Sequence, residues 1–144
     1  MIIDCFLFGG EDDIFKARIN YLKRHVDFFV IIESNTTFTG IERLFKLKKL
    51  VNKFFPEIID KFFIFENRNY ISSLNDLTKI NYWPFHENSK SIEAILFQVS
   101  KQKFKKEISF NEGYQRELIF HAINELISKK LNLKLTNNDW IILS

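Results

Sequence analysis

Two charged residues near the N-terminus fall among apolar neighbours, where a charge needs a partner. Arg18 shares the face of an expected helix with Phe15 and Ile19, and Glu33 ends the apolar run FFVIIE. Leaving a buried charge without its partner costs about 3–5 kcal/mol, so a buried guanidinium here requires a carboxylate. We expect an ion pair of Arg18 with Asp4 or Glu33, unless Arg18 extends its guanidinium to solvent.

Glu33 has a second candidate role, in binding a ligand. An ionised carboxylate accepts hydrogen bonds from N–H donors, and Glu33 comes at the end of an expected strand. In an open parallel sheet, ligands bind at the carboxyl ends of the strands. The same edge would carry residues 8–13 and 33–40 and the segment that begins at Glu66. Spacing alone leaves both roles of Glu33 open.

The elements that position these residues alternate along the chain. Apolar runs predict strands at 2–8, 27–34, 61–67 and 139–143. Amphipathic patterns predict helices at 11–26, 41–55, 91–104 and 109–130. This alternation predicts an α/β fold, with a Rossmann-like, mostly parallel sheet and helices on both faces. No linker or repeat divides the chain, so we predict a single domain over residues 1–144.

Several expectations concern the ends and the burial of these elements. The helix at 11–26 would bury Ile14, and the helix at 41–55 would bury Ile41 and Leu44. Ser109 and Glu112 fit a capping box at the start of the last helix. The segment 67–90 reads as a long irregular loop, and the closing strand at 139–143 reads as buried.

Composition excludes several classes of protein. The net charge of +3 is small and dispersed, so we expect no nucleic-acid partner. Cys5 is the single cysteine, which fits a reducing compartment. No apolar run approaches the roughly 20 residues that span a bilayer, and no signal peptide is evident. We therefore expect a cytoplasmic protein without a membrane span.

The common nucleotide and metal motifs do not occur. Gly9 and Gly10 do not extend to the dinucleotide fingerprint GxGxxG, and no P-loop sequence is present. The histidines lack the spacing of metal ligands, so we predict no metal site within this chain. A nucleotide site here would have to be of another kind.

Five segments, in this order, resemble glycosyltransferase family 17, which includes the β-1,4-mannosyl-glycoprotein 4-β-N-acetylglucosaminyltransferases. The segments are DCFLF (4–8) with Glu11, Asp13, Arg18 and Leu22; VD and FVIIES (26–34); TFTG (37–40); NE and QR (111–116); and DWIILS (139–144). The resemblance is strong over the first 40 residues and the last 35 or so, and poor between them. It implies the nucleotide-binding half of a glycosyltransferase with the GT-A fold.

The resemblance also implies a reaction and a set of binding residues. The reaction is transfer of a sugar, N-acetylglucosamine, from a UDP-linked nucleotide sugar to a glycan hydroxyl. The implied nucleotide-sugar-binding residues are Phe8, Gly9, Glu11, Glu33, Thr37, Gly40 and Arg116. Glu33 would accept from the uracil imide, and the segment 8–11 would border the base or ribose. Arg116 would reach the diphosphate or form a helix-surface salt bridge, and Thr37 and Gly40 would shape the loop over the nucleotide or only make its turn.

The family's last matching strand continues into an acidic Asp-x-Asp segment, and the given sequence ends at Ser144. In the family, these carboxylates would hold a divalent cation, Mn²⁺ or Mg²⁺, that stabilises the departing diphosphate. The resemblance therefore leaves two readings: part of an active transferase, or an inactive remnant that at most binds a nucleotide sugar or a partner chain. A plain interaction domain is a further reading. A last strand without cover predicts pairing with a second copy, as a homodimer.

Overall fold

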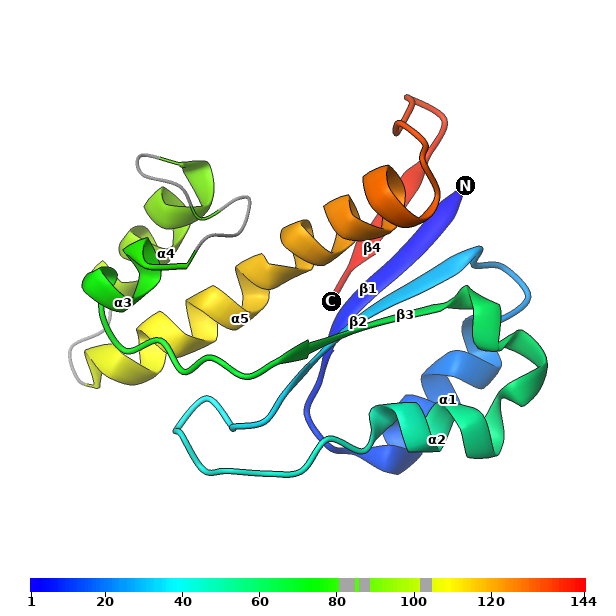
Figure 1. Cartoon of the computed structure of the whole chain (residues 1–144), viewed down its shortest axis with the longest axis horizontal. Coiled ribbons are helices and arrows are strands. Elements are labelled where there is room, and N and C mark those ends of the chain that lie inside the picture. The colour runs from blue at the N-terminus through cyan, green and yellow to red at the C-terminus, as the bar shows by residue number, and fades with distance from the viewer. Residues whose placement is uncertain (81–84, 86–88, 102–104) are drawn as a thin grey trace.

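The computed structural model describes residues 1–80, 85, 89–101 and 105–144, and it has the predicted Rossmann-like α/β architecture (Figure 1). One parallel sheet has the order β3-β2-β1-β4. Its strands are β1 (Ile2–Phe8), β2 (Phe28–Ser34), β3 (Phe62–Asn67) and β4 (Trp140–Leu143). The first and last strands of the described chain are therefore neighbours, with Cys5 opposite Leu143.

Helices cover both faces of this sheet, as expected. One face carries α1 (Asp12–Leu22), α2 (Leu47–Phe54) and a short 3₁₀ segment (Pro56–Lys61). The other face carries α5 (Lys106–Asn124), which continues as a π-helical turn (Glu125–Lys130). Against α5 pack α3 (Leu74–Thr78) and α4 (Lys90–Ser100) (Figure 1). Because both faces are covered, the central strands are apolar on both sides and appear in the sequence as continuous apolar runs.

Side chains of the strands alternate between two hydrophobic cores. In β1, Ile3 and Cys5 point into the core beneath α5, while Phe6 and Phe8 point into the core beneath α1 and α2. The second core is rich in aromatic rings, with Phe8 packed edge-on against Phe15 at 5.6 Å between ring centroids. Each fully buried side chain of this size contributes about 1.5–3 kcal/mol through burial, so both faces fix the register of β1.

The prediction of a helix over residues 41–55 is wrong for the first half of that range. Residues 41–46 are not helical, and α2 begins at Leu47. Ile41 is exposed and Leu44 is 91% exposed, so neither joins the core. Gly40 turns the chain with φ of +89°, and Thr36 and Glu42 then form an isolated antiparallel bridge. The apolar spacing fits a helix, but tertiary contacts hold this segment extended across the sheet edge.

Other element ends and burials also differ from the expectation. The last helix begins at Lys106 rather than at Ser109, which is buried inside α5, so no capping box forms there. Ile14 is exposed on α1. The expected loop at 67–90 contains α3, and its Ile71 belongs to the core. Residues 81–84, 86–88 and 102–104 of the expected loop and of the helix at 91–104 lie outside the described residues.

The prediction that β4 is buried is wrong. All four of its residues are exposed, Trp140 to 70%. β4 is an edge strand that pairs only with β1, and its side chains are exposed on both faces of the sheet. A turn over residues 136–139 leads into it. The Asp139 carboxylate accepts from the Thr136 amide at 2.7 Å and from the Met1 ammonium at 3.0 Å. These contacts, the Thr136 amide first, lower the pKa of Asp139.

Within the described part of the chain, no helix combines the length and the apolar character needed to cross a bilayer.

Candidate functional site

The parallel sheet brings the carboxyl ends of its strands to one edge. Phe8 ends β1, Ser34 ends β2 and Asn67 ends β3, while Ser144 directly follows β4. The Ser144 amide donates to the Cys5 carbonyl at 3.1 Å, so the end of β4 stays close to the end of β1. Ligands of open α/β sheets bind at this edge, which makes it the place to look for a site.

A cavity of ≈ 310 Å³ lies at the end of β1, between the sheet and α1. It is lined by Phe6, Leu7, Phe8, Gly9, Glu11, Ile14, Phe15, Arg18 and Ser144. The structure thus brings together Phe8, Gly9 and Glu11 of the residues implied by the resemblance, and it adds Arg18 as a charged wall. A Cβ on Gly9 would lie 2.7 Å from a Glu11 carboxylate oxygen, so a larger residue here would move this carboxylate from its place over the loop.

Arg18 reaches from α1 to the buried carboxylate of Asp4 in β1. Its Nε donates to Oδ2 at 2.8 Å and its Nη2 to Oδ1 at 2.5 Å, and the guanidinium lies 4.4 Å from the Phe6 ring centroid. The Asp4 side chain is 0% exposed. Of the two candidate carboxylates, the structure therefore places Asp4 against Arg18.

Cys5 lies beside this pair but faces the other core. Burial raises the pKa of its thiol to about 12, and the negative charge of Asp4 adds to the effect while Arg18 opposes it. A thiol with such a pKa stays protonated at neutral pH and is a poor nucleophile. Cys5 is a small core residue, as the apolar run predicts.

The Glu33 carboxylate caps the N-terminus of α2. Its carboxylate is 2% exposed, and Oε1 accepts from the Lys46 amide at 2.8 Å while Oε2 accepts from the Leu47 amide at 3.1 Å. These amides belong to the first turn of the helix, where free N–H groups and the helix dipole favour an anion. Glu33 does not line the cavity at the end of β1.

Thr37 and Gly40 lie in the loop after β2, which α5 holds in place. The Gly40 amide donates to the Thr37 carbonyl at 3.0 Å. The Asn111 side chain, from α5, donates to the carbonyls of Thr37 and Phe38 at 3.3 and 3.2 Å. A Cβ on Gly40 would lie 3.2 Å from the Tyr70 ring, and its φ of +89° favours glycine. This loop does not line the β1 cavity either.

Arg116 lies on the exposed side of α5 near the same loop. Its guanidinium pairs with Glu112 one turn earlier, with Nε and Nη2 at 3.0 and 2.9 Å from Oε1, and lies 5.8 Å from the Phe38 ring. The Arg116 side chain is 53% exposed. Such an exposed pair is worth only about 0.3–0.5 kcal/mol, so another anion can replace Glu112 at small cost.

A buried polar network at the ends of β2 and β3 escaped the sequence analysis. The Asn67 amide donates to the Ser34 hydroxyl at 3.0 Å, and the Tyr114 hydroxyl donates to the Asn67 side-chain oxygen at 3.0 Å. These bonds fix α5 against the sheet edge. The one available signal was an amide residue ending the third strand, but its partners are 33 and 47 residues away in sequence.

The described residues offer no site for a metal ion. No three His, Cys, Asp or Glu side chains in that part of the chain lie close enough to share a cation. The divalent cation that the resemblance implies has no such cluster of ligands among the described residues.

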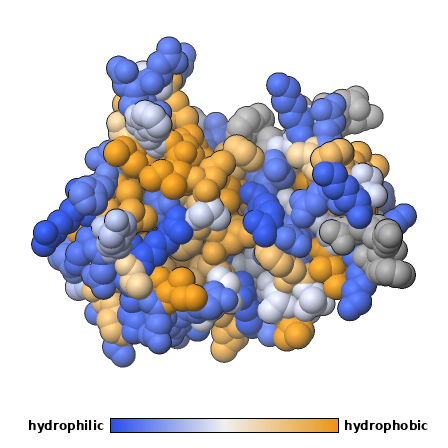
Figure 2. Space-filling model, turned by 180° about the vertical axis from the view of Figure 1, so that it is seen from behind, coloured by the Kyte–Doolittle hydropathy of each residue, from blue (hydrophilic) through white to orange (hydrophobic). Residues whose placement is uncertain are grey.

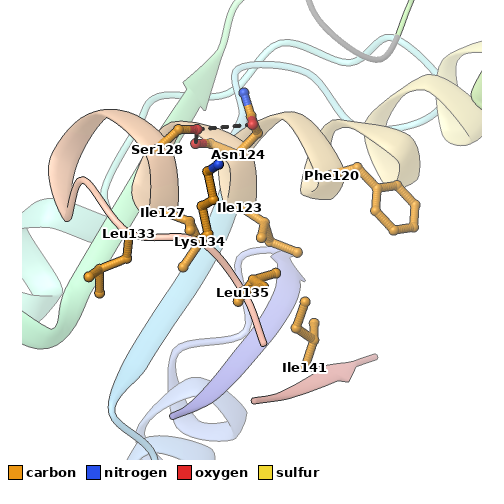
Figure 3. A pocket seen from close by; sticks show the side chains of 9 residues that line it. All are labelled: Phe120, Ile123, Asn124, Ile127, Ser128, Leu133, Lys134, Leu135 and Ile141. Atoms are coloured by element: carbon orange, nitrogen blue, oxygen red, sulfur yellow. Dashed lines mark hydrogen bonds between the residues drawn. The ribbon is translucent and has the colours of Figure 1, made fainter. Parts of the chain in front are cut away.

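A second cavity, of ≈ 360 Å³, lies between the end of α5 and β4 (Figure 3). It is lined by Phe120, Ile123, Asn124, Ile127, Ser128, Leu133, Lys134, Leu135 and Ile141. The close-up view shows Leu135 and Ile123 beside Ile141 of β4. Its lining is largely apolar, so this groove suits apolar side chains better than a nucleotide.

One comparison with known proteins gave a match. The model of glycosyltransferase family 17 matches residues 1–107 of the 144 in this chain. The match includes the cavity residues Phe8, Gly9, Glu11 and Arg18, and it ends before Arg116. Comparisons with curated proteins and with solved structures gave no match.

Proposed function

This chain belongs to glycosyltransferase family 17, and from that membership we propose that it binds the nucleotide-sugar donor of a glycosyltransferase. The donor is UDP-linked N-acetylglucosamine, and the acceptor is a glycan hydroxyl. The observation that carries the proposal is the cavity at the end of β1, whose lining residues, apart from Ser144, lie within the part of the chain that matches the family. It lies where α/β sheets bind nucleotides.

The cavity residues have the chemistry to hold a nucleoside. The exposed Glu11 carboxylate can accept hydrogen bonds from ribose hydroxyls or from a base N–H. Gly9 has no side chain, so the ligand can approach the backbone closely. Arg18 also lines the wall, where its charge is balanced by the Asp4 carboxylate, so it contributes N–H donors rather than a net positive charge. Arg116 can exchange Glu112 for the diphosphate at the neighbouring loop.

Calorimetric titration with UDP tests this proposal. Glu11→Ala is expected to weaken UDP binding about tenfold, because one good hydrogen-bonding group is worth about 1.4 kcal/mol. The matched control is Glu57→Ala, which removes an exposed carboxylate from the 3₁₀ segment before β3 and leaves affinity unchanged. Absence of binding by the unmodified chain, or equal losses in both variants, contradicts the proposal.

The same titration, repeated with manganese, tests whether a divalent cation contributes to UDP binding by this chain. The described residues hold no cluster of ligands, so the UDP affinity of this chain is expected to stay within about twofold when Mn²⁺ is added. A tenfold gain in affinity would locate cation ligands within these 144 residues.

We further propose that a second copy of this chain pairs with β4. An edge strand presents unpaired N–H and C=O groups, and β4 adds exposed apolar side chains. Seen from behind, apolar side chains gather over the end of the molecule where β1 and β4 lie (Figure 2). Trp140 and Ile142 are among the exposed apolar residues.

Sedimentation equilibrium tests this pairing. The unmodified chain is expected to dimerise at tens of micromolar, and Ile142→Lys is expected to be monomeric, because a charge on an edge strand opposes pairing. Tyr21→Lys is the control, since Tyr21 is an exposed ring on α1 and does not belong to the edge strand. A monomeric unmodified chain, or a dimer that survives Ile142→Lys, contradicts this proposal.

A further inference from the structure

One arginine joins the carboxyl ends of the two central strands. The Arg43 guanidinium donates to the Ser34 carbonyl at 2.8 Å, the Gly9 carbonyl at 2.8 Å and the Phe8 carbonyl at 3.0 Å. Ser34 ends β2, whereas Phe8 and Gly9 lie where β1 passes into its loop. The planar guanidinium spreads its donors over three nitrogens and so reaches three separate carbonyls, whereas lysine presents all its donors from one nitrogen.

Lys46 extends this contact by one residue along the same loop. Its Nζ donates to the Gly10 carbonyl at 2.9 Å and lies 2.6 Å from the Asp12 carboxylate. The Lys46 amide is itself bound by Glu33. The consecutive carbonyls of residues 8, 9 and 10 are therefore all held by side chains from the segment 41–46.

The loop between β1 and α1 contains two glycines, which would make it mobile without these contacts. Gly9 and Gly10 follow β1 directly, and Gly10 has a φ of +100°. Glycine loses more conformational freedom on ordering than any other residue, so two in succession give a loop with many competing conformations. In the conformation that Arg43 and Lys46 hold, Phe8, Gly9 and Glu11 line the cavity.

We propose that Arg43 is a positioning residue for nucleotide binding: it orders the loop between β1 and α1 and does not itself touch the ligand. The inference rests on the proposed function, because the ligand is the nucleotide assigned to the β1 cavity. When the binding-competent conformation falls to a fraction of the population, the apparent dissociation constant rises by the inverse of that fraction. Loss of Arg43 therefore weakens binding through the loop.

Arg68 provides a matched control. Arg43 and Arg68 line the same cavity of ≈ 370 Å³ beside the loop after β2, together with Asn35, Glu42, Leu44 and Phe45. Arg68 stacks on the Phe45 ring at 4.6 Å and has no hydrogen bond to the loop between β1 and α1. A direct role of this cavity in binding an anion would involve both arginines, whereas positioning involves Arg43 alone.

The experiment compares Arg43→Ala, Arg43→Lys and Arg68→Ala by two measurements, ¹⁵N relaxation and UDP titration. The chain has four glycines, so the amide signals of Gly9 and Gly10 can be followed with Gly113, in α5, as the internal reference. In Arg43→Ala, the order parameters of Gly9 and Gly10 are expected to fall from about 0.85 to below 0.6, with Gly113 unchanged. The UDP dissociation constant is expected to rise about tenfold.

Arg43→Lys keeps the charge but loses most of the carbonyl contacts, so we expect it to follow Arg43→Ala in direction. If the alanine variant fails to fold, the lysine variant replaces it in both measurements. Arg68→Ala is expected to match the unmodified chain in both measurements. Unchanged order parameters in both Arg43 variants, or full rescue by lysine, overturn the inference. If the unmodified chain does not bind UDP, the proposed function fails, and the glycine order parameters still decide whether Arg43 orders the loop.

Discussion

Replacing Arg18 with alanine is expected to lower the free energy of unfolding by about 3 kcal/mol. Asp4 is 0% exposed, and the Arg18 guanidinium is its partner through two hydrogen bonds. Removal of the guanidinium leaves a carboxylate buried in β1 without that partner. Urea denaturation, followed by circular dichroism, measures the loss as a lower midpoint at constant slope.

A matched substitution on the same helix distinguishes the loss of a buried ion pair from the loss of a surface ion pair. Lys16 pairs with the exposed Asp13 at 3.3 Å, so Lys16→Ala is expected to cost less than about 1 kcal/mol. In a double-mutant cycle, Asp4→Asn is expected to recover part of the loss caused by Arg18→Ala, because it removes the stranded charge. Equal effects of Lys16→Ala and Arg18→Ala would show that the Asp4 pair adds nothing beyond a surface contact.

Replacing Glu33 with alanine is expected to cost about 2–3 kcal/mol of stability. The Leu47 amide is buried and would lose its acceptor, and α2 would begin without a negative charge at its N-terminus. Glu33→Gln retains an acceptor oxygen and is expected to cost about half as much. Urea denaturation is again the measurement.

The control for Glu33 is its neighbour in register on β3. Glu66 is paired with Glu33 across the strands but contacts Lys48 and Arg68 near the surface, so Glu66→Ala is expected to cost under about 1 kcal/mol. The Glu33 variants also probe ligand binding. If Glu33→Gln kept full stability but lost UDP affinity tenfold, the carboxylate would be a ligand group rather than the anchor of α2.

The fold was predictable where local pattern and long-range contacts agree. The strands β1, β2 and β3 are apolar on both sides because each packs between two layers of helices. The segment 41–46 was not predictable, because its apolar spacing fits a helix while the bonds of Arg43 hold it extended. Residues 140–143 are as apolar as a buried strand, yet β4 lies at an edge of the sheet with its side chains exposed on both faces, which composition does not encode.

The same distinction explains what was predictable about the candidate site. Phe8, Gly9 and Glu11 come from one loop at the end of one strand, so sequence proximity alone brings them to one cavity. Glu33 also lies near the end of a strand, but its partners depend on where α2 begins, which the sequence pattern misplaced. The contacts of Arg43 span 34 and 35 residues, and no local pattern indicates them.

The two cores differ in how much of the chain each one needs. The core beneath α1 and α2 is made from residues between Phe6 and Phe62, whereas the core beneath α5 draws on residues from Ile3 to Ile127. During synthesis on the ribosome, the first layer can therefore close while the second face of the nascent sheet is still bare. The edge of β1 that pairs with β4 is covered last, because β4 is synthesised after the other strands. It is therefore the part of the sheet that stays accessible to a chaperone for the longest time.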